Sequence, residues 1–302
     1  MRYVAGDLCF WLAAVLLIFG SSSASAEDRF YIGLEAGFSA SGDLDVSQSF
    51  FNHPTRCHSV LYQGSGLNPP TDGECAAAKR SSFGNIFNPG IGFAGGATLG
   101  YALGNGLRFE AEYLNRRQGS ARDLVSLGSD SDDVLDQKGN EWSEEDPPWA
   151  RVRDLNTHHF FVNAYYDLRN ESPFTPYIGG GIGVGSMRIG YSSAWLRKSD
   201  LGMETWQDAA ENTTSSIDTK LEKTRFGFQM IGGVDYALGD DLSVGAKVRW
   251  TRFSGFDRDD VRWTQTFSRE PARADGVTPF TTDFKVGDTD SWIFTVGLKY
   301  YL

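Results

Sequence analysis

The sequence is poor in cysteine and histidine, and beyond its first residues it has no long apolar run. Its 302 residues hold 3 cysteines and 4 histidines, too few for a metalloprotein built on repeated Cys and His motifs. No run of about 18 apolar residues follows the N-terminal segment, so a bundle of transmembrane helices is excluded. Basic residues are also scarce: 28 Lys and Arg stand against 39 Asp and Glu, for a net charge of -11. Nucleic acid and anionic surfaces are therefore not expected as main partners.

Glycine and aromatic residues are abundant. The chain has 35 glycines, and Phe, Trp and Tyr make up 14% of it. Such a composition at modest mean hydropathy favours strands over helices. The length allows one large domain or two ordinary ones.

The N-terminus has the features of a secretory signal peptide. Arg2 supplies the positive charge, Phe10 to Gly20 the apolar segment, and Ala24-Ser25-Ala26 a cleavage site before Glu27. We therefore expect a signal peptide over 1–26 and an exported chain over 27–302; the alternative is an uncleaved anchor. Cys9 precedes the apolar segment, which does not fit a lipoprotein signal.

The other two cysteines are expected to form a disulfide. Cys57 and Cys75 lie 18 positions apart in one connecting segment of an exported chain. Closing that loop would stabilise the fold by about 3 kcal/mol. A metal site with His53 and His58 is the alternative, but "HPTRCH" matches no zinc spacing.

Alternation of apolar and polar residues recurs in eight segments of about 10 to 12 residues, the length of a tilted strand that crosses a bilayer. The third segment contains 107–114, and the others span 30–40, 91–101, 158–168, 175–186, 224–236, 242–251 and 291–302. Three short connections with turn residues alternate with four long ones, at 41–90, 117–156, 192–223 and 254–289. This predicts an all-β fold: an eight-stranded antiparallel up-and-down transmembrane barrel with four long extracellular loops and three short periplasmic turns.

Aromatic residues recur at fixed heights on the apolar faces of these segments, which a soluble sandwich does not require. The predicted periplasmic girdle comprises Tyr101, Tyr166, Tyr236 and Tyr300. The predicted outer girdle comprises Phe38, Phe93, Tyr113, Phe160, Phe226, Trp250 and Trp292.

The opposite faces carry charges, as "LRFEAEYL" at 107–114 illustrates. An unpaired charge is costly in hydrocarbon, so these residues are expected to point into the barrel and pair with one another. The predicted lumen network comprises Glu35, Arg108, Glu110, Glu112, Asp167, Asp235, Lys247, Arg249 and Lys299.

The signal peptide, "FYIGLEAGFS", "TPYIGGGIGVG" after "NAYYDL", and the terminal "SWIFTVGLKYYL" resemble the small eight-stranded outer-membrane proteins of the OmpA-like barrel, opacity-protein and surface-antigen group. The resemblance covers the strands of 27–302. It implies insertion into the outer membrane of a Gram-negative bacterium by the barrel-assembly machinery, and contact with outer-membrane lipids and lipopolysaccharide. It also implies a structural, adhesive or antigenic surface role.

Three other chemistries have partial support in the sequence. "GGGIGVG" at 179–185 does not fit G-x-G-x-x-G in any register and has no following helix. The acidic segment 117–156 could gather calcium, but Val134 stands where a calcium loop starting at Asp130 needs a ligand. A lipid A deacylase needs a Ser, His and acid set on the outer face, and no serine accompanies His158, which is expected to face lipid while His159 faces the lumen. We therefore expect no catalytic residues, no metal and no cofactor.

The expected function is that of a surface protein whose extracellular loops carry a structural, adhesive or antigenic role, with host-surface ligands as partners. A small pore for ions or minor solutes is the alternative. Because an eight-stranded interior is just wide enough to be filled by side chains, little conductance is expected.

Overall fold

The computed structural model describes residues 28–51, 81–124, 149–196, 214–266 and 280–302. Within these ranges the chain forms thirteen strands and no helix. None of the described residues therefore belongs to a helix that could cross a membrane. The predicted signal peptide and the cysteines Cys57 and Cys75 lie outside the described residues.

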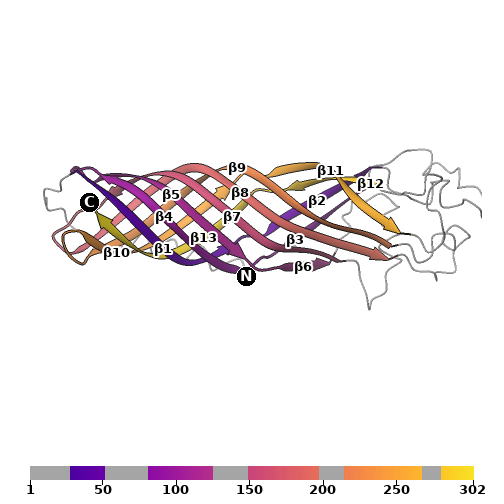
Figure 1. The fold of residues 1–302 in the computed structure, drawn as a ribbon, viewed down its shortest axis with the longest axis horizontal. Coiled ribbons are helices and arrows are strands. Elements are labelled where there is room, and N and C mark those ends of the chain that lie inside the picture. Colours follow the sequence, from indigo (N-terminus) through magenta and orange to yellow (C-terminus); the bar gives the residue numbers. More distant parts are fainter. Residues whose placement is uncertain (1–27, 52–80, 125–148, 197–213, 267–279) are drawn as a thin grey trace, which may run out of the picture.

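Eight of the strands close into a barrel, which confirms the predicted fold class. Each pairs antiparallel with the next, and the last pairs with both β10 and β1. These strands are β1 (Arg29–Ser41), β4 (Ile91–Ala102), β5 (Leu107–Gln118), β7 (Trp149–Asp167), β8 (Phe174–Leu196), β9 (Thr214–Ala237), β10 (Leu242–Phe253) and β13 (Thr289–Tyr301). Figure 1 shows them as the tilted wall of one cylinder. Closure leaves no unpaired edge in this wall, as a bilayer requires.

Period-two alternation places the apolar residues on the outside of this wall. On β5, Leu107 and Phe109 are exposed while Arg108 and Glu110 are buried. Short turns join the strands at one end, where Gly106 has a φ of 95° that favours glycine. Leu302 donates its backbone N–H to the Phe30 carbonyl at 2.8 Å, so both ends of the barrel chain meet at this turn side.

The residues predicted as aromatic girdles lie on the outward face. Tyr166 and Tyr300 are about half exposed near the turns, as are Phe38 and Phe93 toward the opposite end. Rings of one belt touch: the Tyr113 and Phe160 centroids are 5.1 Å apart.

The predicted bounds of the four long loops are wrong. The loops do not begin where the bilayer-crossing segments end, because further strands lie between. Segments assigned to the long connections instead form β2 (Leu44–Phe51), β3 (Ser81–Phe87), β6 (Ala121–Leu124), β11 (Phe256–Thr266) and β12 (Phe280–Val286). The strands β7, β8 and β9 also run well past their predicted limits. They continue into a second tier, in which the strands pair in the order β6, β7, β8, β9, β11, β12, β2, β3. β3 comes close to β6 and β7 without pairing with them in the described residues.

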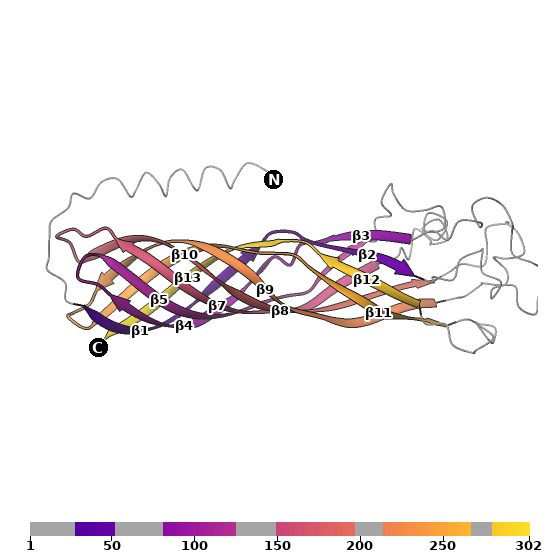
Figure 2. The ribbon, with the colours of Figure 1, turned by 90° about the horizontal axis from the view of Figure 1, so that it is seen from above.

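We call this second tier the extension; it prolongs the barrel on the side opposite the turns (Figures 1 and 2). Its interior is apolar. Fifteen buried residues form one cluster there: Leu44, Val46, Phe87, Ala121, Ala150, Val152, Leu155, Met187, Ile189, Tyr191, Ile217, Leu221, Phe256, Phe284 and Val286. The extension thus has a hydrophobic core of its own, on top of the membrane barrel.

A bulge on β7 helps join the tiers. The register with β8 shifts between Arg153 and Asn156, and Asp154 has a φ of 52°. The bulge changes which residues face inward: Ala150 and Val152 are buried before it, and Leu155 after it. β7 therefore keeps apolar residues in the core of the extension and polar ones in the lumen below.

Candidate functional site in the barrel lumen

A first layer of charges lies nearest the turns. The Arg108 guanidinium is 2.9 Å from the Asp167 carboxylate and 3.1 Å from that of Asp235. Lys299 donates to the same Asp235 carboxylate at 2.5 Å. Arg108, Asp235 and Lys299 come from β5, β9 and β13, so these pairs tie distant strands together across the lumen.

Tyrosine rings surround this layer. The Arg108 guanidinium lies 4.6 Å from the Tyr177 ring centroid and 5.2 Å from that of Tyr165. The Lys299 ammonium lies 4.9 Å from the Tyr177 ring. These cation–π contacts stabilise cations that have lost their water. Tyr177 and Tyr165 are themselves in edge-to-face contact, with centroids 5.6 Å apart.

A second layer crosses the middle of the lumen. Lys247 lies 3.2 Å from the Glu110 carboxylate and 3.4 Å from that of Glu35. Arg249 pairs with Glu112 at 3.0 Å and also with Glu35. All five side chains are almost fully buried.

Neutral side chains complete the hydrogen bonding of this layer. Tyr165 and Tyr31 donate their hydroxyls to Glu110 at 2.8 and 3.0 Å. Gln229 donates to the Asn163 carbonyl oxygen at 2.7 Å, and Asn163 donates to Glu112 at 3.2 Å. A buried ionic network that is nearly fully hydrogen-bonded avoids most of the penalty of burying charge.

The glycines of β8 give these side chains room. Gly179 lies under the Tyr165 ring and Gly183 under Phe161, so a Cβ at either position would collide with its neighbour. Gly181 stands in the same way against Asn163. The lumen-facing glycines of the "GGGIGVG" run therefore leave room for the large lumen residues opposite them.

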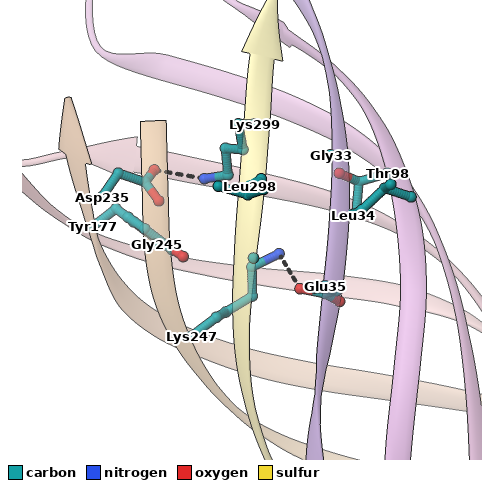
Figure 3. Close-up of a pocket in the computed structure, with 11 residues that line it drawn as sticks. Gly33, Leu34, Glu35, Thr98, Tyr177, Asp235, Gly245, Lys247, Leu298 and Lys299 are labelled. Carbon is teal, nitrogen blue, oxygen red and sulfur yellow. Dashed lines mark hydrogen bonds and ion pairs between the residues drawn. The ribbon is translucent and has the colours of Figure 1, made fainter. Parts of the chain in front are cut away.

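Little space is left within the network. A void of about 20 Å³ lies between Lys247, Lys299 and Asp235, enough for one water molecule (Figure 3). Figure 3 also shows the Lys299–Asp235 and Lys247–Glu35 pairs that border it. A larger hollow of about 620 Å³ opens at the turn side and ends on Asp167 and Asp235. We call this hollow the vestibule; the ionic network closes its inner end.

The nine residues predicted for the lumen network are all brought together in these two layers. They are Glu35, Arg108, Glu110, Glu112, Asp167, Asp235, Lys247, Arg249 and Lys299. The structure adds Tyr31, Tyr165, Tyr177, Asn163 and Gln229, which the prediction of the network omitted. Their place on the charged face of each strand was a signal that could have included them.

A third layer, which we call the arginine layer, lies between the network and the core of the extension. Arg116 on β5 and Arg225 on β9 point inward and are 2% and 4% exposed. His159 is fully buried beside the Phe253 ring, at a centroid distance of 4.8 Å. The sequence analysis expected His159 to face the lumen, where the structure places it, but it included neither arginine in the network. Arg116 lies just past the stretch 107–114, and Arg225 lies within the predicted strand 224–236.

Among the described residues, no group of three or more His, Cys, Asp or Glu side chains is placed to hold a metal ion. His158 lies on the outer face, where its Nδ1 is 2.9 Å from the Tyr113 hydroxyl. A calcium loop starting at Asp130, within the acidic segment 117–156, would fall in 125–148, which lies outside the described residues.

One exposed ion pair lies at the junction between the barrel and the extension. Asp288, in the connection between β12 and β13, accepts from Arg252 at 3.0 Å and from the Gly255 N–H at 2.8 Å. The Arg252 hydrogen bond first, and then the Gly255 N–H, lower the pKa of the Asp288 carboxyl.

Comparison with known proteins places the chain among outer-membrane barrels. The family model described as "Outer membrane protein beta-barrel domain" matches residues 11–268. An uncharacterized protein of Brucella abortus (strain 2308) is 27% identical over 147 residues, which cover 46% of this chain and 45% of that protein. The chain thus spans less than half the length of the curated relatives it matches.

Two solved structures are similar in fold. Neisserial surface protein A is 14% identical, with a TM-score of 0.38; the match covers 91% of this chain and 99% of that one. The outer membrane protease OmpT from Escherichia coli is 10% identical, with a TM-score of 0.44; the match covers 93% and 99%.

Proposed function

Because this chain belongs to the family of outer membrane protein beta-barrel domains, we propose that it is a non-conducting, non-enzymatic barrel of the Gram-negative outer membrane. In this proposal the barrel anchors the extension at the cell surface, where it acts in adhesion or recognition. The observation that carries the proposal is the filling of the lumen. Ionic layers occupy the membrane part, and an apolar core occupies the extension.

The filled lumen supports anchoring rather than transport. A solute entering the vestibule would meet Arg108, Asp167 and Asp235 in contact with one another. To pass, it would have to separate buried charge pairs, and breaking one such pair costs about 3–5 kcal/mol. The layer of Lys247 and Arg249 and then the apolar core stand behind the first layer.

The extension supports a surface role because it presents a water-facing wall that is rich in charges. On β11, Asp257, Arg258, Asp259 and Arg262 are exposed, while Phe256 turns inward. The segments 52–80, 125–148, 197–213 and 267–279 connect the strands of the extension. Host-surface molecules are the proposed ligands of these connections, and lipopolysaccharide and lipids are the proposed neighbours of the barrel. Insertion by the barrel-assembly machinery is part of the same proposal.

Two measurements test this function. In planar bilayers, the purified protein should give no reproducible conductance steps. On whole cells, variants that lack 52–80, 125–148, 197–213 or 267–279 should reach the outer membrane in normal amounts, and at least one should lose adhesion to host cells or serum survival. Normal adhesion and survival in all four variants would contradict the surface role.

The alternative is a small pore, which the vestibule of about 620 Å³ at the turn side favours. The same bilayer recording separates the two. Regular openings that persist in all four deletion variants would support the pore and overturn the anchor.

A further inference from the structure

We propose that a small inorganic anion of halide size binds inside the barrel, between Arg116 and Arg225 in the arginine layer. The site lies above the ionic network and below the apolar core of the extension. It is independent of the surface role proposed above, because it depends only on the interior of the wall.

The first argument is that these two cations lack negative partners. In the network below, each of Arg108, Lys247, Arg249 and Lys299 has a carboxylate within 4 Å. Among the residues that the structure describes, no carboxylate forms a salt bridge with Arg116 or Arg225. Asp288 is the carboxylate whose charge acts on Arg225, but Asp288 is exposed and forms its salt bridge with Arg252. Two buried charges therefore remain uncompensated.

The second argument is the number of buried N–H groups that have no hydrogen-bond acceptor. Nε and Nη1 of Arg116 and Nε of Arg225 are buried and have no hydrogen-bond partner. Arg225 uses its other nitrogens on neutral acceptors: the Ser254 carbonyl and the Thr289 hydroxyl, both at 2.9 Å, and the Met187 sulfur at 3.2 Å. Buried donors of this kind are rarely left unpaired in folded proteins.

The third argument is that these donors belong to one layer. Arg116 is the register partner of Thr157, whose hydroxyl is also buried and unpaired. Two residues further along β7, both ring nitrogens of His159 lack partners. His159 and Arg225 both pack on the Phe253 ring, at 4.8 and 5.5 Å. Inward positions of β5, β7 and β9 thus surround one interior region.

The chemistry of the layer selects an anion. Arginine presents only donors, and both arginines carry positive charge at neutral pH. A cation or an apolar molecule would leave the uncompensated charge in place, whereas an anion would neutralise it and accept the idle N–H groups. The rings of Phe161 and Phe253 and the Met187 side chain crowd the layer, which favours a monatomic or similarly small ion.

Binding to the folded barrel alone links stability to anion concentration. The test uses the folded protein in a zwitterionic detergent without halide. Its urea midpoint is measured in sodium gluconate and in sodium chloride at one ionic strength. Chloride should raise the midpoint, and above the dissociation constant the rise should follow the logarithm of the chloride concentration. A wild-type midpoint that is the same in both salts would overturn the proposal.

Variants locate the effect. Arg116→Met should lose the chloride response, because it removes one of the two cations. Arg117→Met is the matched control: it is the next residue on β5, exposed on the outer face, and should keep the full response. Equal responses in the two variants would contradict the proposed position. A phosphate series run in parallel should show a weaker shift than chloride, and a stronger one would replace the halide with an oxyanion.

A second measurement does not depend on variants that fold. Crystals of the wild-type protein grown or soaked in bromide should give an anomalous peak between the Arg116 and Arg225 guanidinium groups. No peak there at saturating bromide would overturn the proposal.

Discussion

The two halves of β9 follow the same alternation with opposite polarity. In the lower half, Phe226, Phe228 and Met230 face outward and Arg225, Gln229 and Asp235 face inward. In the upper half, the outward residues are Asp218, Lys220 and Glu222, and the inward ones are Ile217 and Leu221. The pairing with β8 runs without a break through both halves.

What lies outside the wall explains this difference. Where lipid surrounds the barrel, apolar side chains are at no disadvantage outside, and the polar ones turn inward and pair. Where water surrounds it, the hydrophobic effect drives apolar side chains inward. On β9 the change occurs between Thr224 and Phe226, which places the outer surface of the bilayer there. The same sheet runs through both tiers, and the solvent decides which face is apolar.

The largest expected effect is on the ionic interior. Arg249→Ala leaves Glu35 and Glu112 without their main partner and should destabilise the barrel by about 3–5 kcal/mol. Arg252→Ala is the matched control on the same strand; it breaks only the exposed pair with Asp288 and should cost about 0–1 kcal/mol. Urea unfolding after refolding into lipid vesicles measures both, and equal costs would contradict the buried role of the network.

Shortening an apolar side chain in the core of the extension should destabilise the extension and leave the barrel strands intact. Ile189→Ala removes a fully buried side chain and should cost about 2–5 kcal/mol. Its signature is selective: proteolysis of the extension should accelerate while the membrane strands stay protected. Ile86→Ala, at a position that is 60% exposed on β3, is the control and should have little effect. Unchanged proteolysis of Ile189→Ala would argue against a packed core.

A reciprocal exchange on β9 sharpens the comparison of the two outer faces. Met230→Arg places a charge in the middle of the lipid-facing half and should cost about 2–4 kcal/mol. Lys220→Phe places an aromatic residue on the water-facing half and should change stability by less than about 0.5 kcal/mol. Similar costs for the two exchanges would mean that both halves face the same solvent.

The smallest expected effect is the loss of stability in acid that comes from the exposed pair of Asp288 and Arg252. The folded-state pKa of Asp288 is depressed, so its contribution to stability is present above the pKa of an unfolded Asp, about 4. That contribution is lost as the pH falls through the lower folded-state value. Asp288→Asn should therefore remove a small part of the acid sensitivity below about pH 4. The unfolding midpoint of each protein against pH measures the difference.

The closed barrel could be predicted because lipid imposes one rule on all eight bilayer-crossing segments. Residues such as Leu107, Phe109 and Tyr113 mark the lipid face, and the charges between them mark the lumen. The extension could not be found by that rule. In "SIDTKLEKTRFGF", the apolar residues change from odd to even positions at Thr224, which looks like the end of a strand although the strand continues. On β7, the bulge at Asp154 disturbs the pattern as well.

The site was predictable to the same extent. The charged residues of the network followed from alternation within the bilayer-crossing segments. Arg116 stood between the stretch 107–114 and the predicted connection that begins at 117, and Arg225 lay within a predicted strand, but neither was included in the network. Which cation meets which carboxylate depends on how strands far apart in sequence lie across the lumen, as with Glu35 on β1 and Arg249 on β10. No local pattern encodes that arrangement.

The most direct test is a spin-label scan along β9, with accessibility to oxygen and to a water-soluble nickel complex measured at each position. Labels at 226, 228 and 230 should be accessible to oxygen, and labels at 218, 220 and 222 to nickel. Labels at 217, 221 and 229 should be shielded from both. Oxygen accessibility continuing through 218–222, or nickel accessibility at 217 and 221, would contradict a wall that changes polarity at the bilayer surface.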